Sequence, residues 1–261
     1  MKGKTNIVIS DLKDFLDNRV ALYNNLPFIE HDPISIPHLF SSKENIEISG
    51  FLTAIISWGQ RKQIIKSARH LMSLMDDDPY GFLVNSDKKD LLRFRQFYYR
   101  TFNNTDCMFF LDRLKEIYNS GQNLQQLFEN QYAESGNIKD SIAGFRQQFF
   151  GKADPKRSGK HLSDPAKGSS AKRINMFLRW MIRQDDNGVD FGLWKSIPMS
   201  ELRIPLDTHS GNVARKLGLL QRSNDDWKSV EELTGILRQF DPADPVKYDF
   251  ALFGLGINEK F

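Results

Sequence analysis

The sequence predicts an all-α protein. Apolar residues recur at three-to-four-residue spacing in one segment after another, as at 48–56 and 64–75, which is the period of an amphipathic helix. No stretch keeps up the strict alternation of apolar and polar residues that favours a sheet. The 261 residues, 40% of them hydrophobic, are enough to fill a large core. We therefore expect one unit of two packed helical lobes, with residues 44–150 in the first and residues 1–43 and 151–261 in the second.

Turn and capping residues divide the first half of the chain into separate helices. Residues 57–60 (SWGQ) indicate a tight turn after the first strongly apolar helix. Residues 76–79 (DDDP) end the next helix and cap its successor, because Asp accepts hydrogen bonds from free amides and Pro fits a first turn. Four further helices are expected at 88–102, 107–120, 124–131 and 138–149.

A change of composition marks a loop between the two halves of this helical pattern. Residues 151–170 are rich in Gly, Lys, Ser, Asp and Pro, which favours an irregular segment that faces a partner. The elements expected beyond it are a helix at 171–184, a helix that opens at Asp207 and ends at Leu217 before Gly218, a helix at 227–240, and a last helix introduced by Asp241-Pro242 and Asp244-Pro245.

The cysteine count and the N-terminus exclude several classes of protein. Cys107 is the single cysteine, which rules out an internal disulfide, a four-cysteine zinc site and a four-cysteine iron–sulfur cluster. The first residues lack the apolar core of a signal peptide, and no run approaches ~18 apolar residues. We expect a soluble cytoplasmic monomer with no cofactor, no metal and no membrane association.

Positive charge is concentrated in one part of the second half. Between residues 152 and 183, nine basic residues are opposed only by Asp154 and Asp164, although the whole chain has a net charge of +3. Such a cluster favours a polyanionic partner, because each neutralised phosphate releases a condensed counterion. A solvated basic loop is the simpler alternative. The nine residues are Lys152, Lys156, Arg157, Lys160, Lys167, Lys172, Arg173, Arg179 and Arg183.

The segment at 202–220 is the most informative part of the sequence. An extended approach delivers Asp207 to the start of an amphipathic helix. The segment resembles helix-hairpin-helix DNA glycosylases of the endonuclease III superfamily, in which Pro, an apolar residue and Asp-Thr-His precede a helix with a basic residue and a Leu-Gly end. The matching residues are Pro205, Asp207, Thr208, His209, Arg215, Leu217 and Gly218.

A second segment, at 48–72, is similar to the early helix–turn–helix of the same superfamily. There a Ser-x-x-Gln turn links two helices near the lesion, and Ser57 and Gln60 are the matching positions. The resemblance implies that Gln60 contacts the minor groove or the flipped base.

The resemblance also implies a catalytic lysine ahead of the aspartate. Lys172, at the start of the helix expected at 171–184, is the candidate, while Lys167 or Arg173 could occupy the expected place instead. The interval from Lys172 to Asp207 is longer than usual, and in this the layout is closer to the archaeal 8-oxoguanine glycosylases. The segments AKRINMFLRWMIR, DFGLW and IPLDTH together resemble a bacterial family of unknown function related to those enzymes.

These residues suit the chemistry of base excision. A lysine must be deprotonated to attack C1′ of a sugar, and a helix N-terminus with Arg173 beside it disfavours the ammonium form. Asp207 would stabilise the developing positive charge and assist proton transfer. Loop amides near Gly168 would hold a backbone phosphate. The predicted DNA contacts are Gln60, Lys167, Gly168, Ser169, Arg173, His209 and Arg215.

Simpler roles exist for several residues. Asp207 before Thr at a helix start is also a natural N-cap, a role compatible with catalysis. A lysine such as Lys172 in a basic helix is commonly solvated or a phosphate contact. Trp180 is a core residue or, with its neighbouring arginines, a platform for a base. Asp241 and Asp244 are predicted to be caps rather than a metal pair.

The sequence therefore predicts a DNA glycosylase that acts on damaged double-stranded DNA in a cleft between the lobes, with a helix-hairpin-helix-like element. The expected lesion is an oxidised purine such as 8-oxoguanine. Lys172 would form a Schiff base, so abasic-site lyase activity would accompany base release. Two alternatives stay open: a DNA-binding protein that kept the scaffold without the chemistry, and a helical interaction module whose basic loop meets an acidic protein.

Overall fold

The chain folds into helices joined by short connections. The structure, a computed structural model, describes residues 9–151, 157–259 and 261. These residues contain α-helices and 3-10 helices but no strand, and two isolated β-bridges join Tyr99 to Phe102 and Ser169 to Asp226. The all-α prediction is thus confirmed. Within the same residues, no helix combines the length and apolar character needed to cross a membrane.

The α-helices are α1 (Ile9–Tyr23), α2 (Leu26–Glu30), α3 (Lys43–Ile55), α4 (Arg61–Ser73), α5 (Pro79–Asn85), α6 (Asn104–Asn119), α7 (Leu124–Ser135), α8 (Ile138–Phe150), α9 (Lys172–Ile182), α10 (Thr208–Lys216), α11 (Trp227–Phe240) and α12 (Tyr248–Ile257). The 3-10 helices are η1 (Pro33–Ser35), η2 (Pro37–Leu39), η3 (Asp90–Gln96), η4 (Ser158–His161), η5 (Pro165–Lys167), η6 (Met199–Glu201) and η7 (Pro245–Lys247).

The helix predicted at 88–102 is wrong. The chain forms only the 3-10 helix η3 there and then a tight turn, in which Arg100 has a φ of 53°. Phe97 and Tyr99 are buried on either side of the exposed Tyr98, an alternation that belongs to extended backbone. Burial of two aromatic side chains on one side of the segment therefore outweighs its helical propensity.

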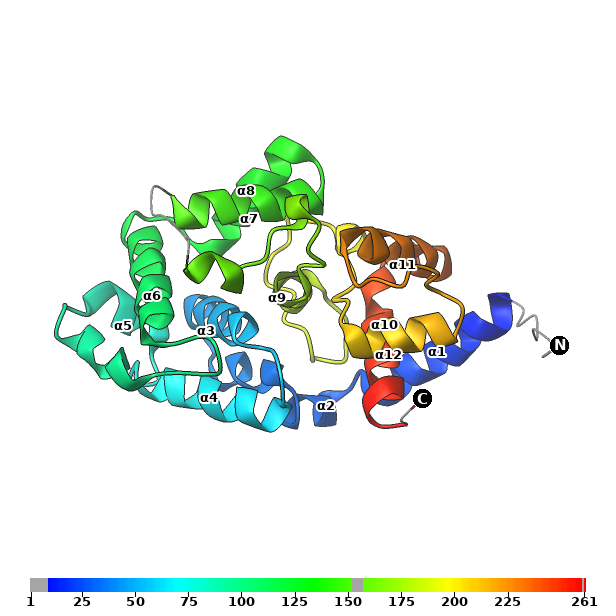
Figure 1. The fold of residues 1–261 in the computed structure, drawn as a ribbon, viewed down its shortest axis with the longest axis horizontal. Coiled ribbons are helices and arrows are strands. Elements are labelled where there is room, and N and C mark those ends of the chain that lie inside the picture. Colours follow the sequence, from blue (N-terminus) through cyan, green and yellow to red (C-terminus); the bar gives the residue numbers. More distant parts are fainter. Residues whose placement is uncertain (1–8, 152–156, 260) are drawn as a thin grey trace.

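Figure 1 shows α3 to α6 at one end of the molecule and α1, α10, α11 and α12 at the other, with α9 between them. Helix α9 packs against α3, α7 packs against α8, and α12 packs against both α1 and α10. The N-terminal helix therefore lies beside the C-terminal one.

Aromatic packing joins α3 to α9 and to α8. The ring centroid of Phe51 on α3 lies 5.5 Å from that of Phe177 on α9, and 5.9 and 5.3 Å from those of Phe145 and Phe149 on α8. Each such pair contributes about 0.5–1.5 kcal/mol beyond its buried area. Trp180 is fully buried, so it belongs to the core and is no platform for a base.

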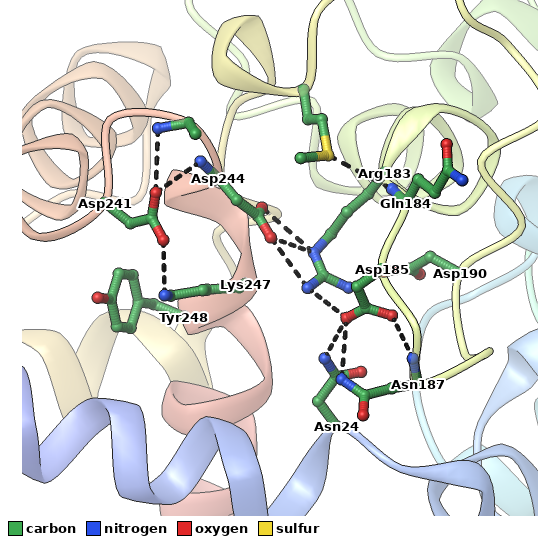
Figure 2. Close-up of polar contacts among 12 residues, drawn as sticks. Asn24, Arg183, Gln184, Asp185, Asn187, Asp190, Asp241, Asp244, Lys247 and Tyr248 are labelled. Carbon is green, nitrogen blue, oxygen red and sulfur yellow. Dashed lines mark hydrogen bonds and ion pairs between the residues drawn. The ribbon is translucent and has the colours of Figure 1, made fainter.

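The C-terminal end of α9 is held by a buried network of ion pairs (Figure 2). Arg183, whose side chain is only 2% exposed, donates to Asp244 at 2.9 Å, to Asp190 at 3.0 Å and to Asp185 at 2.7 Å. Arg179 also donates to Asp190, at 3.2 Å. The network fixes α9 against the segment that precedes α12, since a buried charge must be paired with good geometry.

Pairing inside the protein changes the picture of a single basic surface. Arg179 and Arg183 are buried and compensated, and Arg157 donates to the buried Asp106 at 3.2 Å. Arg179 and Arg183 are therefore not available to a polyanionic partner, whereas the side chain of Arg157 is 48% exposed. Lys152, Asp154 and Lys156 lie outside the described residues.

The two Asp-Pro pairs behave differently from each other. Asp241 accepts hydrogen bonds from the amides of Ala243 and Asp244, both at 3.0 Å, as a cap does. Asp244 makes no capping hydrogen bond and uses its carboxylate on Arg183 instead. The predicted helix start is confirmed at Asp244, the N-cap residue of η7, although its side chain does not make the predicted capping bond. Asp241 closes a turn after α11, and no helix begins there.

Candidate functional site

A cavity of about 940 Å³ opens where the first turns of α9 and α10 meet the turn between α3 and α4. Residues from α12 and from the segment around Asp32 complete its wall. Six of the residues predicted for the site line this cavity, namely Gln60, Ser169, Lys172, Arg173, Asp207 and His209. Lys167, Gly168 and Arg215 do not line it.

Lys172 is the first residue of α9 and points into the cavity. Its Nζ lies 4.0 Å from Oδ2 of Asp207 and 3.4 Å from Sδ of Met176. Its side chain is 27% exposed. Ala171, just before it, has a φ of 49°, a left-handed conformation that costs an L-residue roughly 1–2 kcal/mol. The backbone is thus strained at the residue that starts the helix carrying Lys172.

Asp207 uses its two carboxylate oxygens differently. Oδ1 accepts hydrogen bonds from the amides of His209, at 2.9 Å, and Ser210, at 3.0 Å, while Ser210 Oγ accepts from the Asp207 amide at 3.0 Å. This capping box starts α10. Oδ2 is the oxygen nearest to Lys172. Asp207 therefore caps its helix and still presents a carboxylate oxygen to the lysine.

Aromatic side chains form another part of the cavity wall. Phe28, Trp58, Phe250 and Phe253 line it. The Phe28 ring lies 5.1 Å from Phe250 and 5.9 Å from Phe253 between centroids. The guanidinium of Arg61 lies 4.9 Å from the Phe253 ring centroid. Apolar faces next to a few polar groups suit a planar ligand that needs both stacking and hydrogen bonds.

A family model described as a protein of unknown function, DUF2400, matches residues 32–258. The chain belongs to the DUF2400 family. No similar curated protein and no similar solved structure was found. The DUF2400 match extends from Asp32 past Asp249 and so includes both Lys172 and Asp207.

Two buried carboxylates of this DUF2400 cavity were not predicted. Asp249 on α12 accepts a hydrogen bond from Arg179. Burial raises its pKa to about 6, and the Arg179 cation opposes that rise. Burial also raises the pKa of Asp32, whose Oδ1 accepts from the amide of Ile34 at 3.0 Å. Asp249 could have been noticed, because it is the single charged residue in an otherwise apolar helix and a buried charge needs a partner.

Two arginines predicted to contact DNA have partners within the protein. Arg173 donates to the backbone carbonyls of Ile55 and Lys160 and lies 4.9 Å from the Trp58 ring centroid, and burial lowers its pKa to about 10. Arg215 donates to the carbonyl of Arg222 at 2.7 Å and pairs with Asp225. Both guanidinium groups therefore hold the fold together around the cavity.

The remaining predicted residues lie in the loop before α9 and at the cavity mouth. Gly168, with a φ of 87°, forms the turn after η5, and its carbonyl accepts from the amide of Trp227 at 3.0 Å. Lys167 beside it is exposed, as are Gln60 and His209. Ser169 Oγ accepts from the amide of Ala171 at 3.2 Å. In residues 157–182 the chain forms η4, η5 and α9, so a hairpin of two α-helices is not seen there.

The described part of this DUF2400 chain holds no group of three or more His, Cys, Asp and Glu side chains arranged to bind a metal ion. Of the acidic residues at the cavity, Asp207 lies 4.0 Å from Lys172, Asp249 pairs with Arg179, and Asp225 pairs with Arg215. The site is thus built from a lysine, carboxylates and aromatic rings.

Proposed function

We propose that this DUF2400 protein is a DNA glycosylase that removes an oxidised purine such as 8-oxoguanine from double-stranded DNA and then cleaves the abasic site. The observation that carries the proposal is the meeting of Lys172 Nζ and Asp207 Oδ2, 4.0 Å apart, in one cavity of about 940 Å³. A cavity of this size, within the range of roughly 300–1,000 Å³ typical of ligand sites, can hold a nucleoside.

The reaction begins with the free amine of Lys172. Its lone pair forms a bond to C1′ while the bond from C1′ to the base breaks, and the base leaves with that electron pair and takes up a proton. Opening of the sugar ring then gives the Schiff base, with a proton moving to O4′. Asp207 Oδ2 lies where it can stabilise the positive charge at C1′ and carry a proton between these groups.

Strand cleavage follows from the same intermediate. The protonated imine acidifies the hydrogen on C2′, and a base removes it as the 3′ phosphate leaves with the C3′–O bond electrons. A carboxylate oxygen of Asp207 lies 4.0 Å from Lys172 Nζ, so we assign this second proton transfer to Asp207.

A purine can reach Lys172 only after leaving the base stack, which costs a few kcal/mol and less for a damaged base. Trp58 and Phe253 on the cavity wall offer faces for the extruded base. Asp32 and Asp249, at the same cavity, offer hydrogen-bonding groups for its edge. In this proposal the exposed Lys167 and the turn at Gly168 contact the DNA backbone in place of a complete helix-hairpin-helix element.

The test is borohydride trapping on a duplex that contains 8-oxoguanine or an abasic site. Wild type is compared with Lys172→Ala and with Lys167→Ala, which removes the other candidate nucleophile, an exposed lysine outside the cavity, and both variants are tested at saturating DNA. We expect a covalent adduct with wild type and Lys167→Ala and none with Lys172→Ala. An adduct that survives Lys172→Ala and disappears in Lys167→Ala would assign the nucleophile to Lys167.

Asp207→Asn separates the two roles of the aspartate. Asn caps helices as well as Asp does, so stability should hold while the charge near Lys172 is lost. We expect adduct formation to slow by about 100-fold or more. Tight DNA binding without adduct or base release by wild type, across a panel of lesions, would overturn the enzyme in favour of a DNA-binding protein. Weak, salt-insensitive binding would favour the interaction module.

A further inference from the structure

A second, smaller hollow adjoins the cavity. It has a volume of about 480 Å³ and lies between α4 and the turn at 97–102. Gln60 and Arg100 line both the hollow and the cavity. An extended ligand, such as a nucleic-acid strand, that leaves the cavity past these two residues therefore enters the hollow. The other lining residues are Gln63, Lys66, Ser67, His70, Phe97, Tyr98 and Tyr99.

The turn at 97–102 is braced against the cavity wall. The amides of Tyr99 and Phe102 each donate to the other residue's carbonyl, at 2.7 and 2.9 Å, and the Tyr99 hydroxyl donates to the carbonyl of Trp58. Gly59, with a φ of 97°, lets the Arg100 guanidinium lie against it, since a Cβ there would come within 2.6 Å of Arg100 Nη1. The backbone of the turn is therefore fixed relative to the cavity wall.

The turn at 97–102 exposes an aromatic ring and an arginine to solvent. Tyr98 is 75% exposed, although its neighbours Phe97 and Tyr99 are buried. Arg100 has a φ of 53°, a left-handed conformation that disfavours a residue with a Cβ and that concentrates at functional sites. Because the backbone that carries Tyr98 is already ordered by the turn, only the side chain of Tyr98 loses freedom when a partner stacks on its ring.

The charges around the hollow are positive and uncompensated. None of its lining residues is acidic. In the described part of the chain, Lys66 and Arg100 have no ion pair, whereas Arg69 on the same helix lies 4.0 Å from Asp77. Two free cations beside an exposed ring match the alternating phosphates and bases of a nucleic-acid strand.

We propose that this hollow is a second nucleic-acid contact, in which Tyr98 stacks on the base next to the nucleotide in the cavity. Arg100 and Lys66 pair with the phosphates on either side of that base. The inference rests on the proposed function for what occupies the cavity, but the contact itself requires no catalysis.

The test uses a duplex with a tetrahydrofuran abasic analogue, which cannot be turned over to a Schiff base. Its dissociation constant is measured by fluorescence anisotropy at several salt concentrations. We expect Tyr98→Ala to weaken binding about 10-fold and Tyr98→Phe to restore it, since base stacking needs only the ring. Lys66→Gln and Arg100→Gln should each lower the salt dependence by about one phosphate contact, while Lys139→Gln on α8, outside both hollows, should not.

The location of the contact is tested with the fluorescent base 2-aminopurine, placed at chosen positions in the duplex. Its fluorescence emission falls when the base is stacked. Wild type should quench a 2-aminopurine next to the analogue more strongly than Tyr98→Ala does, and the two should be equal when the probe lies far along the duplex. Equal affinity of Tyr98→Ala and wild type would overturn the contact even if borohydride trapping succeeds. Loss of binding in Tyr98→Ala with no trapping by wild type would keep the contact and remove only the glycosylase.

Discussion

The two ends of α9 carry basic residues in opposite surroundings. At the first residue, Lys172 is 27% exposed and has a single carboxylate oxygen 4.0 Å away, at the edge of a cavity. Just past the last residue, Arg183 is 2% exposed and donates to three carboxylates at 2.7–3.0 Å. A fully compensated buried cation stabilises packing and is not free to react. A partly exposed amine with one loosely placed partner remains available to a ligand.

The same contrast applies to the carboxylates. At the C-terminal end of α9, Asp190 and Asp244 accept hydrogen bonds from buried arginines (Figure 2). Asp207 keeps one oxygen directed to Lys172, and Asp249, although paired with Arg179, borders the cavity. Helix α9 is thus anchored by the ion pairs at its C-terminal end, while the charges at its N-terminal end remain incompletely paired. Substitutions at four positions test this contrast.

The largest expected effect is at the C-terminal end of α9. Arg183→Met leaves Asp185 and Asp244 without a cation and Asp190 with Arg179 alone, so we expect the free energy of unfolding to fall by about 3–5 kcal/mol. Chemical denaturation measures this. The matched control is Arg93→Met, which breaks an exposed pair with Asp76 and should leave the free energy of unfolding nearly unchanged, because solvent screens such a pair. Equal losses in the two variants would contradict the contrast.

The next largest effect is the pH dependence that Asp249 gives to the free energy of unfolding. Its pKa is raised from 3.8 to about 6, so the folded protein binds more protons than the unfolded chain between these pH values. The stability contributed by Asp249 is therefore fully present below about pH 4 and is lost as the pH rises past about 6, a change of about 3 kcal/mol.

Asp249→Asn removes this contribution. The difference in unfolding free energy between wild type and Asp249→Asn should thus fall by about 3 kcal/mol between about pH 4 and pH 7.5, because the other titrating groups are common to both proteins. Denaturation curves at several pH values give the difference. A difference that does not vary with pH would show that Asp249 titrates alike in the folded and unfolded chain.

A smaller effect separates the two oxygens of Asp207. Asp207→Ala removes the acceptor for the amides of His209 and Ser210 and should lower the unfolding free energy by about 1 kcal/mol. Asp207→Asn should change it by only a few tenths of a kcal/mol. Thermal and chemical unfolding of the pair distinguish them. If Asn costs as much as Ala, the carboxylate's charge rather than its capping bond stabilises α10.

The smallest effect is expected at the N-terminal end of α9. Lys172→Met keeps an unbranched side chain and removes an amine that lies 3.4 Å from Met176 Sδ and 4.0 Å from its nearest carboxylate oxygen. The unfolding free energy should change by less than about 0.5 kcal/mol, even though the proposed reaction would be lost. A loss of several kcal/mol would mean that Lys172 is a structural ion-pair partner like Arg183.

The local features of this fold could be predicted from the sequence. Helix α11 has the predicted bounds, the break at 57–60 separates α3 from α4, and Asp207 caps α10. Each depends on residues within a few positions of one another, because helical periodicity and capping act within one or two turns. The helix predicted at 88–102 failed where the burial of Phe97 and Tyr99 outweighed helical propensity.

The sequence by itself determined the helical class, the bounds of several helices such as α8 and α11, and the candidate pair Lys172 and Asp207. Only the tertiary structure decided that these two side chains meet in one cavity, that Arg173 and Arg183 bind partners inside the protein, and that Asp249 lines the same cavity. The physical reason is range. Caps and helical stripes are set by neighbours in sequence, whereas the pairing and burial of charges depend on which distant helices pack together.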